Sequence, residues 1–246
     1  MSGNTMPPVT VTIGISTGIG DRAHQCDATA TATAPDGTVA VALIDGIGDT
    51  PEVADTAGLL ARVAARVGCR RGALAGLLAA AELVSSGTAD LTVPNAIGVL
   101  AVVYPDGQTV VGHCGDARAH SWNGHTLDIH TVDHTLAQLV REHSERGAWR
   151  RVGLGGLEDG VRTTLARATV GSIATTTLTA GDHTVILTSD GVHRALGDDA
   201  EEHVAAIAQL HPLPRELADR LTRAALNTST PRGTRDNATA AVLRIH

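Results

Sequence analysis

Three aspartates that lie far apart in the sequence are the residues best placed to do chemistry. Asp45 and Asp190 each end a short apolar run and are followed by glycine, and Asp236 opens the last apolar run. We expect these runs to be strands, so each carboxylate would stand where rigid backbone stops and the chain turns. Hard cations such as Mg2+ and Mn2+ prefer oxygen ligands. The set predicts a metal site for phosphate chemistry, although a single Asp-Gly pair more often marks a turn.

The cysteines and histidines offer no competing site. Cys26, Cys69 and Cys114 form no CxxC pair, so neither a disulfide framework nor a structural zinc site is indicated. The twelve histidines are scattered and lack a metal-binding spacing such as HExxH. We expect reduced, mostly buried thiols and histidines with structural or surface roles.

Charge and composition exclude several classes of partner. The net charge is −7, and no stretch concentrates arginine with aromatic residues, which argues against a nucleic-acid surface. No basic segment precedes an apolar one at the N-terminus, and no apolar run is long enough to cross a bilayer. We therefore expect a cytoplasmic, monomeric protein with no membrane or nucleic-acid partner. Residues 1–246 read as one domain whose first few residues are flexible.

The elements that must position the aspartates follow from hydrophobic periodicity. Strands are predicted at 8–17, 26–34 and 38–45, the last two joined by a Pro-Asp-Gly turn. Helical spacing follows at 52–66 and 71–84, with a break between Gly68 and Gly72. Three strands and two adjacent helices therefore precede the middle of the chain.

The second half repeats this alternation of strands and paired helices. Residues 96–130 read as an antiparallel meander with turns at Pro105-Asp106-Gly107 and Asn123-Gly124. The remaining segments are a helix at 133–147, a β-prone stretch at 161–179, a strand at 183–190, helices at 199–210 and 214–226, and a last strand at 237–245. Such an order fits sheets covered by helices better than a regular βαβ alternation.

Six segments in this order resemble the signature segments of the metal-dependent Ser/Thr protein phosphatases, the type 2C family. The resemblance covers nearly the whole chain and rests on RAHQCD (22–27), LIDGIGD (43–49), VVGHCGDAR (110–118), TVDHTLAQLV (131–140), LTSDGV (187–192) and TRDNATAAVL (234–243). It implies an α+β fold, a four-layer α-β-β-α sandwich of two mostly antiparallel sheets flanked by pairs of antiparallel helices.

The resemblance also implies a centre of two Mn2+ or Mg2+ ions, with a third ion bound more weakly. Asp45 would bridge the two ions and Gly46 would add its backbone carbonyl. Asp190 and Asp236 would supply the remaining carboxylates, and Asp116 would be a ligand of the third ion. Two cations in such a centre lower the pKa of a bound water and clamp the phosphoryl oxygens.

Further residues take roles around this centre. Arg22 resembles the arginine that binds the phosphoryl group, which a guanidinium can do in bidentate fashion. Asp27 and Asn237 would contact the metal-binding residues and hold them in place without binding a metal ion themselves. Asp133 and His134 match another family segment, and we favour a structural role for His134. Arg118 could contact substrate or form an ion pair with a strand-end carboxylate.

The chain departs from the family pattern at three positions. Cys26 stands where the family has a glutamate that orders water around the metals. Ile47 follows the Asp-Gly pair where some members have a histidine assigned to leaving-group protonation, and an isoleucine cannot serve as that acid. Asp49 is also unusual, and it could be a further metal carboxylate or the N-terminal cap of the helix near Pro51, which we favour.

These observations support two main hypotheses. The first is an active phosphatase that hydrolyses phosphoserine and phosphothreonine in a protein substrate and opposes a Ser/Thr kinase. The second is a catalytically impaired pseudophosphatase that binds a phosphoprotein as a regulatory module, because Cys26, Ile47 and Asp49 depart from the family pattern. A phosphatase of a partner-switching pathway is a third, but such proteins often carry a sensor domain, and none is recognised in this sequence.

Overall fold

The strands of the protein form two antiparallel five-stranded sheets. The computed structural model describes residues 8–85, 93–145, 160–178, 184–228 and 233–246, so the expected flexible N-terminal residues lie outside the described part. The first sheet has the order β2 (Asp27–Thr33), β3 (Val39–Ile47), β4 (Asn95–Val103), β5 (Thr109–Cys114), β8 (Ala174–Leu178). The second has the order β1 (Val11–Gly18), β10 (Ala238–Ile245), β9 (Thr184–Thr188), β6 (Arg118–Trp122), β7 (Leu127–Ile129).

The two sheets pack face to face through a dry core. Side chains alternate across a strand, so Val41 and Leu43 of β3 point toward the other sheet, whereas Ala42 and Ile44 point toward the helices. Leu243 of β10 lies in the same inter-sheet cluster as Leu43. With no phenylalanine in the chain, this core is built from Val, Leu, Ile and Ala.

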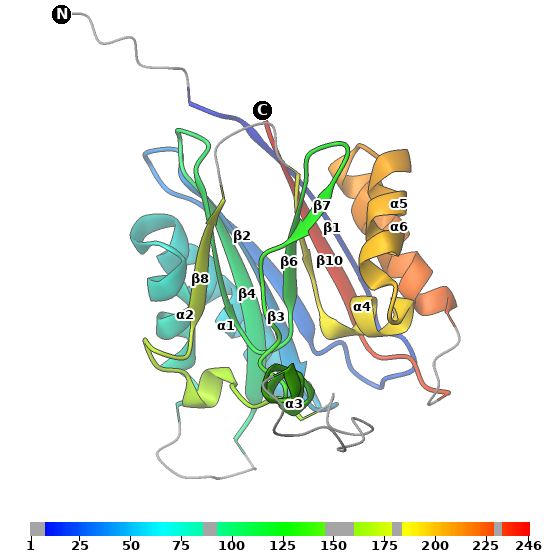
Figure 1. Cartoon of the computed structure of the whole chain (residues 1–246). Helices are drawn as coiled ribbons and strands as arrows, with labels where there is room; N and C mark the ends of the chain where they lie inside the picture. Colours follow the sequence, from blue (N-terminus) through cyan, green and yellow to red (C-terminus); the bar gives the residue numbers. More distant parts are fainter. Residues whose placement is uncertain (1–7, 86–92, 146–159, 179–183, 229–232) are drawn as a thin grey trace, which may run out of the picture.

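Helices cover the outer face of each sheet, as Figure 1 shows. The first sheet carries α1 (Pro51–Arg71) and α2 (Ala73–Ala81). The second carries α4 (Asp190–Leu196), α5 (Ala200–Leu210) and α6 (Pro214–Asn227), while α3 (Leu136–Glu145) lies at one end of the sandwich. The expected four-layer α-β-β-α sandwich is therefore confirmed.

The break between the first two helices, predicted between Gly68 and Gly72, falls at Gly72. Helix α1 continues through Gly68 and stops at Gly72, whose φ of 87° is a left-handed conformation that favours glycine. A Cβ at Gly68 would lie 2.8 Å from Leu100 Cδ2, so this glycine serves close packing of helix on sheet. Gly68 is a contact position and not a helix end.

The predicted antiparallel meander is wrong in one respect, because it is divided between the sheets. Strands β4 and β5 pair in the first sheet, and β6 and β7 pair in the second, while β5 and β6 do not pair. The chain crosses at Gly115, Asp116 and Ala117, where Gly115 has a φ of 105°. The β-prone stretch at 161–179 is a strand only from Ala174 to Leu178, within the described residues, and includes the short 3-10 helix η1 (Leu165–Arg167).

Among the described residues, none of the helices combines the length and the apolar character that crossing a membrane would require.

Candidate metal and phosphate site

One end of the sandwich collects the chemically active residues. Asp45 lies two residues before the end of β3, and its odd position places it on the inter-sheet face with Val41 and Leu43. Asp190 is the first residue of α4, directly after β9, and Asp236 lies just before β10. Because β3 belongs to one sheet and β9 and β10 to the other, these carboxylates come from both sides of the inter-sheet boundary.

The carboxyl groups of Asp45 and Asp190 lie close enough to influence each other's ionisation. Burial raises the pKa of Asp45 well above its ordinary value, and the nearby charges of Asp190, Asp27 and Asp116 raise it further. Buried carboxyl groups this close together form a place where a positive charge is strongly favoured.

Asp27 supports this pair from the neighbouring strand. It lies directly opposite Asp45 in the β2–β3 register, so the two carboxyls share a face of the sheet. Ser189 donates its hydroxyl to Asp27 at 2.8 Å, and the same hydroxyl accepts the Thr239 N–H at 3.0 Å. Burial raises the pKa of Asp27 to about 7. Asp27 therefore links the two sheets directly behind Asp45 and Asp190.

The loop that carries Arg22 is held by the amide of Asn237. The Asn237 Nδ2 donates to the carbonyls of Ile19 at 2.8 Å and His24 at 3.1 Å, and its Oδ1 accepts the Cys26 N–H at 2.8 Å. The side chain is buried, and each of its three polar partners belongs to the loop at 19–26. Asn237 therefore fixes the backbone on both sides of Arg22.

Asp49 holds the same loop from the opposite side. Its carboxylate accepts the N–H of Ala23 at 3.0 Å and that of His24 at 2.7 Å, and the His24 ring lies 3.3 Å away. These two backbone hydrogen bonds lower the pKa of Asp49. The predicted capping role of Asp49 is wrong, because Thr50 is the residue that caps α1 and accepts the Val53 N–H.

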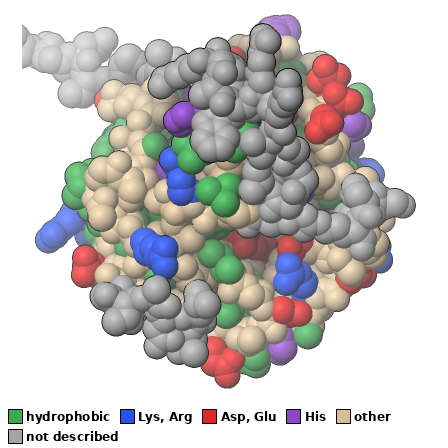
Figure 2. Space-filling model, turned by 60° about the horizontal axis from the view of Figure 1, so that its bottom comes forward, with side chains coloured by type: hydrophobic (Ala, Val, Ile, Leu, Met, Phe, Trp, Pro, Cys, Tyr) green, Lys and Arg blue, Asp and Glu red, His purple; other side chains and the backbone are tan. Residues whose placement is uncertain are grey.

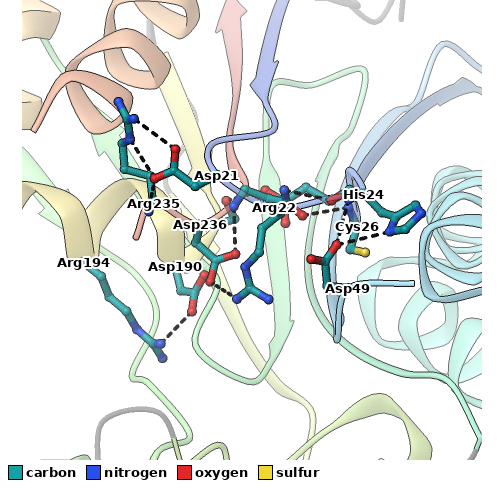
Figure 3. A network of polar contacts seen from close by, with 12 residues as sticks. Asp21, Arg22, His24, Cys26, Asp49, Asp190, Arg194, Arg235 and Asp236 are labelled. Carbon is teal, nitrogen blue, oxygen red and sulfur yellow. Dashed lines mark hydrogen bonds and ion pairs between the residues drawn. The ribbon is translucent and has the colours of Figure 1, made fainter. Parts of the chain in front are cut away.

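Figure 3 shows that Arg22 points from this loop toward Asp236 and Asp190. Its Nη2 donates to Asp236 Oδ2 at 2.6 Å, and both side chains are 39% exposed. A second ion pair beside it joins Arg235 to Asp21 through two hydrogen bonds of 3.0 and 3.1 Å. Arg22 is therefore accessible to an anionic ligand yet held next to the carboxylates.

Asp116 lies at the crossover between the sheets and is buried against Arg194. Its side chain is 2% exposed and accepts a close hydrogen bond from the Arg194 guanidinium. The other guanidinium nitrogen lies 2.8 Å from Asp190. Burial and the charge of Asp190 raise the pKa of Asp116 to about 7, while Arg194 acts to lower it. In this structure Asp116 is thus paired with an arginine.

Arg118, Asp133 and His134 have structural contacts. Arg118 binds Asp133 through two hydrogen bonds of 3.0 and 2.8 Å and also binds Glu201 at 2.8 Å. The His134 ring accepts the Gly115 N–H at 3.3 Å and stacks against His113. Of the two roles considered for Arg118, the ion pair with a carboxylate is the one observed.

The positions that depart from the family pattern lie beside Gly46. Cys26 is buried, its thiol is 3.8 Å from the Thr50 carbonyl, and burial raises its pKa. The Gly46 N–H donates to the Cys26 carbonyl at 3.0 Å, and a Cβ on Gly46 would lie 2.9 Å from that carbonyl oxygen. Ile47 is 45% exposed at the mouth of the site. Ile47 carries no group that could order water or supply a proton, and the Cys26 thiol is directed at the Thr50 carbonyl.

The chemistry of the donors fits hard divalent cations. The donors are carboxylate oxygens, and those of Asp45 and Asp190 have raised pKa values because burial, followed by the charges of neighbouring carboxylates, disfavours their charged forms. Within the described ranges, however, no three His, Cys, Asp or Glu side chains already converge on one point. Instead, Arg22 pairs with Asp236, and Arg194 pairs with Asp116 and Asp190. Figure 2 shows acidic side chains set back near the middle of this face, with a basic side chain beside them.

Comparisons with known proteins support the fold. No protein-family model matches the sequence, and the search of curated proteins found no match. Solved structures do match. A serine/threonine phosphatase from S. agalactiae superposes with a TM-score of 0.76 at 16% identity, covering 95% of this chain and 99% of that chain. PppA, a regulatory component of T6SS in Pseudomonas aeruginosa, gives 0.74 at 20% identity over 96% and 98%.

A third structure contains the metal. The catalytic domain of the serine/threonine protein phosphatase PstP, in complex with 2 manganese ions, superposes with a TM-score of 0.73 at 20% identity, covering 96% of this chain and 99% of that chain. The chain therefore has the fold of the bacterial Ser/Thr phosphatases over nearly its whole length.

Sequence reasoning missed two contributors to the site. Arg194 was not singled out, because α4 is only seven residues long and follows an apolar strand without a periodic pattern of its own. Ser189 was read only as part of the Ser-Asp-Gly segment, yet its hydroxyl joins Asp27 to Thr239. A helix prediction beginning at Asp190 would have revealed Arg194, because residues four apart on a helix are neighbours.

Proposed function

We propose that this chain is a metal-dependent protein Ser/Thr phosphatase that hydrolyses phosphoserine and phosphothreonine. The observation that carries the proposal is that Asp45 and Asp190, which come from different sheets, lie close together beside the accessible Arg22. The fold, which is that of Ser/Thr phosphatases, supports the same reading. The partner is a phosphorylated protein, and in a cell the enzyme would oppose a Ser/Thr kinase.

The chain's own residues take distinct parts in this proposal. Asp45, the Gly46 carbonyl, Asp190 and Asp236 would hold two Mn2+ or Mg2+ ions, which supply an activated water and charge for the phosphoryl oxygens. Once Asp236 is engaged in this way, the Arg22 guanidinium can exchange that carboxylate for the substrate phosphate. Asn237 and Asp49 keep the backbone of the arginine loop in place during the exchange.

The leaving serine or threonine also needs a proton. Ile47, at the mouth of the site, cannot donate one. The proton would then come from solvent, to which Arg22 and Asp236 are both open. Hydrolysis of a substrate with an acidic leaving group, such as p-nitrophenyl phosphate, would suffer least from the lack of a general acid.

The second candidate is a pseudophosphatase that binds a phosphoprotein without hydrolysing it. The specific observation in its favour is that Arg22 and Arg194 pair with the carboxylates, and no three acidic side chains converge among the described residues. In such a protein Arg22 would bind the phosphate and the aspartates would hold the arginines. Calorimetric titration with Mn2+ separates the two, because a folded protein that binds no Mn2+ favours the binding module.

Activity in the presence and absence of metal tests the proposal. We expect the wild-type protein to hydrolyse p-nitrophenyl phosphate and a phosphothreonine peptide with Mn2+ and to lose this activity in EDTA. Asp45→Asn should reduce kcat/KM by at least about 100-fold, because the bridging carboxylate is removed. Asp128→Asn, an exposed aspartate on β7, is the control and should keep wild-type rates. Hydrolysis that survives EDTA, or full activity of Asp45→Asn, would contradict the proposal.

A further inference from the structure

Arg194 places a fixed positive charge between two carboxylates of the site. One nitrogen of its guanidinium lies 2.8 Å from Asp190, and the other contacts Asp116 more closely. Asp116 is 2% exposed and the Asp190 side chain is 15% exposed, so both carboxylates that Arg194 contacts are largely removed from solvent, while the Arg194 side chain is 32% exposed. Figure 3 shows Arg194 reaching from α4 toward Asp190.

Asp116 and Asp190 require a positive charge beside them, because two largely buried carboxylates repel each other. Asp116 and Asp190 are largely removed from solvent, and Arg194 is a cation that contacts both carboxylates. A guanidinium stays charged at every accessible pH and binds carboxylates in a planar, forked geometry. It also belongs to the chain, so its occupancy does not depend on the concentration of an ion in solution.

The backbone positions this arginine firmly. Arg194 lies four residues after Asp190 on α4, the spacing that brings two side chains together on one helix face. The start of α4 is packed so closely that a Cβ on Gly191 would lie 1.9 Å from the Asn237 carbonyl oxygen. The helix that carries both Asp190 and Arg194 is therefore held against the segment that carries Asp236.

We propose that Arg194 is a built-in cation that occupies the place between Asp116 and Asp190, so that the centre takes two metal ions and excludes a third at Asp116. This inference rests on the proposed function, because it concerns the same metal centre. Arg194 acts through the carboxylates and is a positioning residue. It neutralises Asp116 and orients the Asp190 oxygens that remain for the two ions.

Counting bound Mn2+ tests the proposal without measuring activity. Free Mn2+ gives an EPR signal that bound ions lose, so a titration at pH 7.5 yields the number of ions per chain. We expect two ions for the wild type, three for Arg194→Met and two again for the double variant Arg194→Met/Asp116→Asn. Arg215→Met is the control, because Arg215 also pairs with an aspartate four residues away on a helix, at a 72% exposed site on α6.

The outcomes separate this proposal from the proposed function. Three ions in the wild type, or two in a folded Arg194→Met, would overturn the role of Arg194 and leave the phosphatase proposal intact. A wild type that binds no Mn2+ contradicts the phosphatase proposal and this one with it. If circular dichroism shows that Arg194→Met does not fold, the comparison of Asp116→Asn with the wild type decides. A third ion held by Asp116 would be lost in Asp116→Asn, so a lower count in that variant would overturn the proposal. We expect two ions in both proteins.

Discussion

At the level of single residues, Asp49 illustrates how a carboxylate can support the proposed phosphate-binding arginine from outside the site. Its oxygens accept the N–H groups of Ala23 and His24, directly after Arg22. The backbone that carries the guanidinium is thereby held from the α1 side, while Asn237 holds it from the β10 side. The position of Arg22 therefore depends on residues that follow it in sequence by a long way.

Replacing Asp49 should weaken the use of phosphate. Asp49→Asn removes the charge from two hydrogen bonds, and hydrogen bonds to a charged acceptor are stronger than those to a neutral amide. We expect kcat/KM for a phosphopeptide to fall about 10- to 100-fold, mainly through a higher KM, with Mn2+ affinity unchanged. Asp36→Asn is the matched control, an exposed aspartate that accepts a backbone N–H in the β2–β3 turn. Unchanged KM in Asp49→Asn would show that the loop keeps its shape without this charge.

The residues of the site differed in how far they could be predicted. Asp45, Asp190 and Asp236 were recognisable from local sequence. Each carboxylate lies next to a glycine or asparagine at one end of an apolar run. The role of Asp49 was mistaken because Asp and Thr are both good helix caps, and only the geometry selects Thr50. The Asp116–Arg194 pair is a contact between distant segments, which no local pattern encodes.

At the level of elements, the small residues of α1 and α2 let the helices approach the first sheet closely. A Cβ at Gly76 of α2 would lie 2.5 Å from Leu100 Cδ2 and 2.6 Å from the Ala64 carbonyl of α1. Gly58 of α1 is different, because its nearest neighbour would be the flexible end of Arg62 at 3.4 Å. One glycine is required by packing and the other is not.

These two glycines should respond in opposite directions to the same substitution. Gly76→Ala should lower the free energy of unfolding by about 1–3 kcal/mol, because the backbone of α1 blocks the added methyl group. Gly58→Ala should raise it by up to about 1 kcal/mol through better helix propensity. Urea denaturation followed by circular dichroism measures both. Equal effects would mean that α1 and α2 can separate to accept the methyl group.

The elements themselves were largely predictable, but their assignment to sheets was not. Alternating and apolar runs marked the strands, and the turns at Pro105-Asp106-Gly107 and Asn123-Gly124 formed as expected. The crossing at Gly115 and Asp116 was hidden because a glycine-containing turn between two buried strands looks the same whether the strands pair or change sheets. This crossing is what buries Asp116 beside α4.

At the level of the whole molecule, the buried aspartates and the buried histidines change the free energy of unfolding in opposite directions as pH changes. Burial raises the pKa of Asp27 and Asp116 to about 7, so between about pH 4 and 7 these two carboxyls bind more protons in the folded state than in the unfolded chain, and their contribution to stability falls as pH rises. Burial lowers the pKa of His120 and His134 to about 4, so below pH 6.5 these histidines make stability rise with pH. Above pH 6.5 only the aspartates act.

The metal-free protein should therefore lose stability between pH 6.5 and 8. In EDTA we expect Tm to fall by about 5 °C over this range, since Asp27 and Asp116 by themselves amount to roughly 1.5 kcal/mol and each kcal/mol is about 2–4 °C for a chain of this size. Asp27→Asn should show a smaller fall, because one of the carboxyls that titrate in this range is gone. Differential scanning calorimetry makes the comparison. A Tm that rises from pH 6.5 to 8 in the wild type would contradict the assignment.

The placement of Asp45 on one sheet and of Asp190 and Asp236 on the other has a consequence for folding. Neither sheet can assemble the site alone, and β10, which pairs with β1 and β9, follows the other described strands in sequence. A nascent or truncated chain that stops before Asp236 would carry Asp45 and Asp190 but would lack Asp236 and the Asn237 amide that holds the Arg22 loop. The candidate site would then be complete only once β10 has docked between β1 and β9.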